Sequence, residues 1–212
     1  MDEQELEQEQ EKRVVKGYEI THSIRIGERE VVFGVNPQAQ EPYLCALYHE
    51  EYQIIQYKDC YEHCFISDNY IEMMELFAQY VKEQCAQVRE MWASITVPHT
   101  VITEDMCVPC DKLNLVDKVV AIKPDVFYPE YRSAHNQLML VTGGFGSMPN
   151  ARGTSCATVE LYSGKNGCCR RYDILGVIKP ECLPDWAKGR LAEIKHEQAE
   201  KAVKNHNSRE ER

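Results

Sequence analysis

Long hydrophobic runs are missing from this 212-residue sequence. No stretch of about 18 consecutive apolar residues is present, which excludes a transmembrane helix. The first residues, MDEQELEQEQEKR, are acidic and have no apolar segment behind them. We therefore expect neither a signal peptide nor a transit peptide, and place the protein in the cytoplasm without a membrane partner. Internal repeats and low-complexity linkers are also missing.

Disulfide bonds are not expected, although the chain has ten cysteines. This content is below the ~8–10% typical of disulfide scaffolds, and the cytoplasm keeps thiols reduced. Cys107 and Cys110 form a CxxC pair, and this spacing suits structural zinc because two thiolates close one corner of a tetrahedron. A second CxxC pair is absent, so we expect free thiols, no zinc and no other cofactor.

Charge is distributed unevenly along the chain. Residues 1–122 carry a net charge of −13 and residues 123–212 carry +3, within a total of −10. Such asymmetry is typical of a chain with partners matched to each part, or of a solvated acidic surface.

The length fits one large domain or two small ones, and 43% apolar residues are enough for a hydrophobic core. The order of the expected elements predicts an α+β fold, with an antiparallel meander plus a long helix followed by a small β-barrel-like unit and a C-terminal helix. We expect the following segments: a disordered acidic tail (1–13), a β-meander plus helix domain (14–96), a connector (97–116), a small β-barrel-like domain (117–182), and a C-terminal helix and tail (183–212).

The meander is predicted from alternating apolar residues and turn signals. YEITHSIRI (18–26) and REVVFGV (29–35) flank a Gly-Glu turn signal. We expect two more strands at 42–48 and 52–58, joined by a short His-Glu-Glu turn.

Periodicity predicts a helix over residues 68–94. Ser67 or Asp68 is the expected N-cap, and Glu72 and Glu75 suit the positive end of the helix dipole. The apolar residues recur every three or four positions, which places them on one buried face: Ile71, Met74, Phe77, Val81, Cys85, Val88 and Trp92.

The second half of the chain reads as short strands with tight turns, which favours a small barrel or a highly curved sheet. A helix is expected to start near Pro184 or Asp185, and its apolar spacing fades after Ile194. The expected strands are 117–122, 135–141, 154–162, 168–172 and 173–178.

The glycine-dense stretch TGGFGSMPNARG (142–153) raises the question of phosphate binding. A P-loop needs a lysine directly after the last glycine, whereas Thr154 and Ser155 follow here. A dinucleotide loop opens a helix, but the residues that follow have a strand pattern. We expect a structural hairpin loop, with Phe145 packed on the barrel and Arg152 available to a partner or an anion.

In the C-terminal half, basic residues are interspersed with aromatic residues, and this pattern is compatible with nucleic-acid binding. The half is only weakly positive, whereas dedicated nucleic-acid-binding domains are far more basic. The candidate partner- or anion-binding residues are Arg132, Arg152, Lys165, Arg170, Arg171 and Trp186.

Several motifs carry a resemblance to uncharacterised accessory proteins of conjugative and integrative mobile elements of Firmicutes. They are a Tyr-Arg-x-x-x-x-Gln-Leu run, a Gly-Gly-Phe-Gly loop that ends in Ala-Arg-Gly, and a Leu-Pro-x-Trp-Ala ending. The matching positions are Tyr131, Arg132, Gln137, Leu138, 143–146, 151–153 and 183–187. The resemblance covers the chain from about residue 18, and the cysteines Cys107 and Cys110 depart from it.

The resemblance implies a non-enzymatic interaction role, with a host or element protein as the partner. Inhibition of a host defence enzyme that targets nucleic acid is its most specific form, because carboxylates can occupy a groove built for phosphate. The alternative is nucleic-acid binding through the basic C-terminal half. A small enzyme is the third hypothesis, and no motif supports it.

Overall fold

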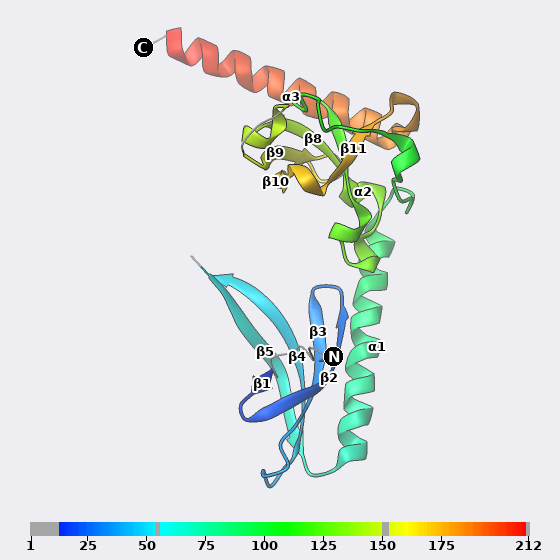
Figure 1. Ribbon diagram of the computed structural model, residues 1–212, viewed down its shortest axis with the longest axis vertical. Coiled ribbons are helices and arrows are strands. Elements are labelled where there is room, and N and C mark those ends of the chain that lie inside the picture. Colours follow the sequence, from blue (N-terminus) through cyan, green and yellow to red (C-terminus); the bar gives the residue numbers. More distant parts are fainter. Residues whose placement is uncertain (1–12, 54–55, 150–152, 211–212) are drawn as a thin grey trace, which may run out of the picture. The chain divides into compact units, whose positions relative to one another are not determined.

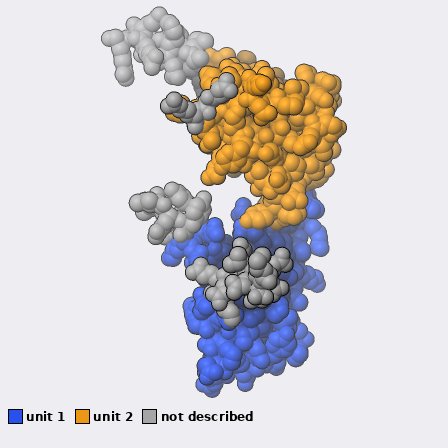
Figure 2. Space-filling model, in the orientation of Figure 1, with its two compact units in different colours: residues 1–95 blue, residues 96–212 orange. Residues whose placement is uncertain are grey.

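The structure is a computed structural model that describes residues 13–53, 56–149 and 153–210. The chain divides into two compact units, residues 1–95 and residues 96–212 (Figure 2). Each unit combines an antiparallel sheet with a long helix, which confirms the predicted α+β class (Figure 1). The predicted acidic tail lies outside the described residues, except for Arg13.

The first unit is a five-stranded antiparallel meander in which each strand pairs with the next. The strands predicted at 18–26 and 29–35 are confirmed at both ends. The five strands are β1 (Val14–Val15), β2 (Tyr18–Ile26), β3 (Arg29–Val35), β4 (Tyr43–Gln53) and β5 (Gln56–Ser67).

The predicted turn at His49-Glu50-Glu51 is wrong, because β4 and β5 form one long hairpin. His49 pairs with Cys60, and the ladder continues to the pair between Gln53 and Gln56. His-Glu-Glu has no Gly, Pro, Asn or Asp to favour a turn, and the neighbouring strand satisfies its backbone groups instead.

Alternation along the strands gives the first sheet two buried faces. Phe33 and Leu47 belong to the cluster that packs against the helix, while Val32 and Leu44 belong to a cluster on the other face. Arg13 covers part of this other face: its guanidinium lies 3.9 Å from the Tyr48 ring centroid. Arg13 is therefore part of the folded unit and not of a disordered tail.

Helix α1 (Tyr70–Ser94) lies along the first sheet and confirms the predicted helix (Figure 1). Its N-cap is Asn69, not Ser67 or Asp68. The Asn69 side-chain oxygen accepts hydrogen bonds from the backbone N–H groups of Ile71 (3.1 Å) and Glu72 (3.3 Å). These bonds satisfy two of the N–H groups that have no partner within the helix.

The buried face of α1 is rotated from the predicted one. Its buried residues are Met73, Phe77, Tyr80 and Gln84. Ile71 and Trp92 were predicted to be buried but are 63% and 41% exposed. Most apolar residues of a helix share one half of its surface, so spacing alone does not select the narrower stripe that contacts the sheet.

The second unit contains a six-stranded antiparallel sheet with the order β10-β9-β8-β7-β11-β6. This order has two ends, so the described strands form an open sheet and not a closed barrel. The strands are β6 (Cys107–Val108), β7 (Val119–Ile122), β8 (Leu138–Gly143), β9 (Ser155–Glu160), β10 (Asn166–Arg170) and β11 (Ile174–Ile178). A short helix, α2 (Ala134–Gln137), precedes β8.

The predicted connector, residues 97–116, is instead part of the second unit. Ile102 and Leu115 are fully buried there, and β6 pairs with β11. The buried side chain of Gln137 donates to the Ile102 and Ile122 carbonyl oxygens (3.1 and 2.9 Å) and accepts from the Ile102 N–H (2.8 Å). Proline and missing periodicity therefore marked irregular backbone, not a linker.

Both faces of the second sheet are also buried. Helix α3 (Asp185–Glu210) starts at a predicted position, and its Ala187 and Ile194 pack on one face. Cys110 and Leu115 pack on the opposite face, together with residues of the central strands. The segment 110–115 and the loop after β8 thereby lie next to each other, and the Leu115 N–H donates to the Ser147 carbonyl oxygen.

Candidate protein-binding surface

The glycine-dense loop is built on close contacts between its backbone and strand β9. Gly144 has a φ of +96°, which few other residues adopt, and residues 145–147 then form a single 3-10 turn. The hydroxyl of Ser147 donates to the Gly144 carbonyl oxygen (2.7 Å), and the Ser147 carbonyl oxygen accepts from the N–H of Leu115 (2.8 Å). The predicted structural role of these glycines is consistent with this geometry.

Arg171 ties this loop to the segment 110–113. It lies just after β10, and its guanidinium is partly buried between the two segments. Each terminal nitrogen donates to more than one backbone carbonyl oxygen, and hydrogen bonds from a charged donor are the stronger kind. The acceptors are Gly146 (2.6 Å), Met148 (3.2 Å), Cys110 (2.7 Å), Asp111 (3.3 Å) and Leu113 (2.8 Å).

Large side chains around this clamp are exposed. Phe145 is 86% exposed, so the prediction that it packs on the sheet is wrong. Met148 and Tyr172 are 49% and 53% exposed. The Arg170 guanidinium donates to the Tyr172 hydroxyl and lies 5.6 Å from the Tyr172 ring centroid. We call these four residues (Phe145, Met148, Arg170 and Tyr172) the loop surface.

The structure separates the predicted site residues. Arg170 belongs to the loop surface, whereas Arg171 is engaged by carbonyl groups inside the unit. Lys165 is exposed and lies directly before β10, at its other end. Arg152 lies outside the described residues.

The two remaining candidates make their contacts elsewhere in the second unit. The Arg132 Nε donates to the Phe127 carbonyl oxygen (3.1 Å). Trp186 packs edge-on against Tyr162, with ring centroids 6.0 Å apart, and belongs to the core beneath α3. These contacts give both residues a structural role.

Sequence reasoning missed Phe145 and Met148 as site residues and counted Tyr172 only among the aromatic residues interleaved with the basic ones. Phe145 stands between two glycines in a short connection between strands, which leaves little nearby chain to cover a large ring. This local pattern could have indicated exposure, whereas the positions of Met148 and Tyr172 depend on the distant contacts of Arg171.

The CxxC cysteines are buried in separate clusters, Cys107 beneath α3 and Cys110 on the opposite face. Burial raises the pKa of the Cys107 thiol to about 11 and also raises the pKa of Cys110. Such thiols stay protonated at neutral pH, which disfavours metal ligation and nucleophilic attack. In the described part of the chain, no group of three or more His, Cys, Asp or Glu side chains is arranged to hold a metal ion.

Ser133 and His135 form a buried polar pair in the second unit. The Ser133 hydroxyl lies 2.7 Å from His135 Nδ1, as in a nucleophile–base pair. However, Ser133 and His135 are only 3% and 8% exposed, so a substrate could not reach the hydroxyl in this conformation. Burial lowers the pKa of His135, and nearby His99 lowers it further, so the imidazole is neutral at pH 7.

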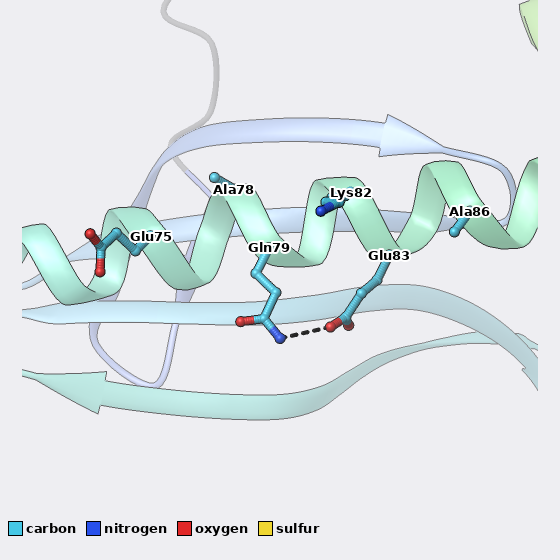
Figure 3. Close-up of a pocket in the computed structure, with 6 residues that line it drawn as sticks. All are labelled: Glu75, Ala78, Gln79, Lys82, Glu83 and Ala86. Atoms are coloured by element: carbon cyan, nitrogen blue, oxygen red, sulfur yellow. Dashed lines mark hydrogen bonds between the residues drawn. The ribbon is translucent and has the colours of Figure 1, made fainter.

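Two hollows that are lined by described residues do not gather convergent chemical groups. One of about 650 Å³ in the first unit is lined only by α1 (Figure 3): Glu75, Ala78, Gln79, Lys82, Glu83 and Ala86. In it the Gln79 amide donates to the Glu83 carboxylate (2.8 Å), and this bond links neighbouring turns of one helix. A second hollow of about 540 Å³ is lined by Thr103, Glu104, Lys123, Pro124, Asp125 and Leu175.

Comparison with known proteins gives no relative. No protein-family model, no curated protein and no solved structure matches this chain. Among the described residues, no helix combines the length and the apolar character needed to cross a membrane.

Proposed function

We propose that this chain is a non-enzymatic binding protein that acts by protein–protein contact through the loop surface. The observation that carries the proposal is the exposure of Phe145, 86%, on a loop whose backbone is held by Arg171 and by two closely packed glycines. An exposed aromatic ring on a rigid loop contributes a large contact area at a small loss of conformational entropy. Such residues dominate the binding energy of many interfaces.

The resemblance to accessory proteins of mobile elements supports a host or element protein as the partner. Charge supports the more specific form, in which the partner is a cytoplasmic enzyme that acts on nucleic acid. Residues 1–95 carry a formal net charge of −11, and residues 96–212 carry +1. Carboxylates of the first unit could pair with the Lys and Arg side chains of a groove built for phosphate.

The proposal is tested by capturing partners from a host lysate with tagged full-length protein after nuclease treatment. We expect Phe145→Ala to abolish the capture of a specific protein, because the anchor ring is lost. Val126→Ala is the matched control, since Val126 is 49% exposed in the same unit but outside the loop surface. Both variants should melt at the wild-type temperature.

Two results would contradict the proposal. The first is equal capture by wild type and Phe145→Ala. The second is capture that disappears on nuclease treatment, which would favour the nucleic-acid alternative through Arg170 and Tyr172.

A further inference from the structure

Among the described strands, β10 has a neighbour on one side, β9, and its hydrogen-bond pattern shows which backbone groups face outward. The N–H of Glu160 donates to the carbonyl oxygen of Lys165 (2.9 Å), and the N–H of Arg171 donates to that of Thr154 (2.7 Å). Antiparallel pairs alternate between hydrogen-bonded and non-hydrogen-bonded positions. The odd-numbered residues from 165 to 171 therefore bond to β9, while the even-numbered ones direct their N–H and C=O groups away from it.

The outward-facing residues are Asn166, Cys168 and Arg170, and all three are exposed. Within the described chain, β10 is the last strand at its end of the sheet. An edge of this kind is a template for an added strand, in which main-chain hydrogen bonds supply affinity.

The charges along this edge select the kind of strand that can be added. The segment 165–171, KNGCCRR, has three cations and no acidic residue. Arg171 is used internally, and Lys165 lies before β10 with the parity of Cys169, which leaves Arg170 as the cation on the face that Asn166 and Cys168 share. A partner strand with carboxylates is favoured.

A second copy of the chain fits this edge poorly. Symmetric antiparallel pairing of two β10 strands about Cys168 would place Lys165 of each copy opposite Arg171 of the other. It would also bring both Arg170 side chains onto the same surface. Like charges that face each other across strands are destabilising.

The two faces of β10 carry different side chains, and this difference predicts the sequence pattern of the added strand. Asn166, Cys168 and Arg170 share one face, and the Cys168 Sγ lies 2.8 Å from the Ser155 Oγ there. Cys169 lies on the opposite face, where it packs with the cluster of Cys110 and Leu115. A matching strand carries carboxylates on the first face and apolar side chains on the second, which is an alternating sequence.

We propose that the outer edge of β10 binds an extended, acidic segment of a partner protein in which carboxylates alternate with apolar residues, as an added β-strand. This inference rests on the proposed binding function and identifies the form of the partner. The loop surface lies beside the Arg170 end of the strand, so Phe145 and Tyr172 would contact residues that flank the added segment.

The test uses full-length protein and a fluorescein-labelled ten-residue peptide in which Glu alternates with Val, followed by fluorescence anisotropy. Cys168→Pro removes an outward N–H and leaves the bonds to β9 in place, because proline is tolerated at strand edges. Cys168→Ala is the matched control for the lost thiol. We expect Cys168→Pro to weaken peptide binding by about tenfold or more, and Cys168→Ala by less than about twofold.

Charge is tested separately with Arg170→Gln. This variant should weaken binding of the Glu-Val peptide but not of a Gln-Val peptide, and a Lys-Val peptide should not bind. An unchanged melting temperature shows that the variants remain folded.

The inference is overturned if the wild-type protein does not bind the Glu-Val peptide, if Cys168→Pro binds it as Cys168→Ala does, or if the Lys-Val peptide binds equally well. Concentration-dependent dimerisation that Cys168→Pro abolishes would also overturn it, in favour of a second copy. If Phe145→Ala loses partner capture but Cys168→Pro does not, the inference fails while the proposed function stands.

Discussion

At the scale of single residues, two glycines determine the shape of the loop surface. A Cβ on Gly144 would lie 2.6 Å from the Ser155 carbonyl oxygen, and one on Gly146 would lie 2.3 Å from that of Thr154. Both obstacles are backbone atoms, which cannot move aside as a flexible side chain could. The glycine-dense sequence thus reflects close approach of two backbone segments, and phosphate binding is not needed to explain it.

We expect Gly146→Ala to lower the free energy of unfolding by roughly 2–3 kcal/mol, because the new methyl group forces the loop away from β9. Gly189→Ala is the control. Gly189 lies in α3, and a Cβ there meets nothing within 4 Å, so this change should raise stability by about 0.5–1 kcal/mol. Urea denaturation of both variants measures the difference, and a Gly146→Ala variant as stable as wild type would refute the contact.

Arg171 shows the limit of interpreting residue types. In the sequence it is one of several cations beside aromatic residues, and it was a reasonable candidate for anion binding. Its hydrogen bonds reach carbonyl groups 23 to 61 residues away in the chain. No local pattern reports such contacts, whereas its neighbour Arg170 is exposed.

At the scale of elements, the local sequence pattern predicted which helices and strands exist better than it predicted the contacts that they make. Strands β2 and β3 were predicted at both ends because alternating residues and a glycine turn mark them. The β4–β5 hairpin was predicted too short, because the turn was placed at 49–51 and the following strand was ended at residue 58, whereas β5 continues to Ser67. Helix α1 was predicted with the correct C-terminal residue but with part of the wrong face toward the sheet.

The contacts of α1 predict unequal effects for two aromatic residues on the predicted stripe. Phe77 is 7% exposed and meets the Phe33 ring edge-on at 6.2 Å, so Phe77→Ala should cost about 3–5 kcal/mol. Trp92 is 41% exposed, so Trp92→Ala should cost clearly less. Thermal and urea unfolding compare the two variants, and an equal or larger loss for Trp92→Ala would show that the predicted stripe, and not the observed one, is the buried face.

At the scale of the whole molecule, the described residues form two hydrophobic clusters in each of two units. Every cluster draws its described residues from one unit only: two from residues 18–81 and two from residues 102–194. The acidic charge is concentrated in the first unit, and the loop surface with its basic edge strand belongs to the second.

This separation predicts that residues 96–212 fold without the first unit. The fragment keeps both of its clusters and all six strands of its sheet. We expect a single cooperative thermal transition by circular dichroism and dispersed amide resonances by NMR. A fragment that starts at residue 117, the predicted domain start, should not fold, because it lacks Ile102, Cys110 and Leu115. Cooperative folding of that shorter fragment, or failure of the longer one, would contradict the observed boundary.

The sequence by itself determined the α+β class, most strands, both long helices and the position of the glycine loop between two strands. These features depend on the periodicity of apolar residues and on turn residues within a short stretch of the chain. Local sterics and the burial of one face of each element are enough to produce them. Only the tertiary structure decided that residues 97–116 belong to the second core, that Arg171 is a clamp, and that Phe145 is exposed. Those outcomes depend on which distant segments pack together, as when Gln137 bonds to Ile102 and Arg171 to Cys110. The tertiary structure also decided that β10 lies at an edge, because the position of a strand in a sheet depends on the order of all the strands.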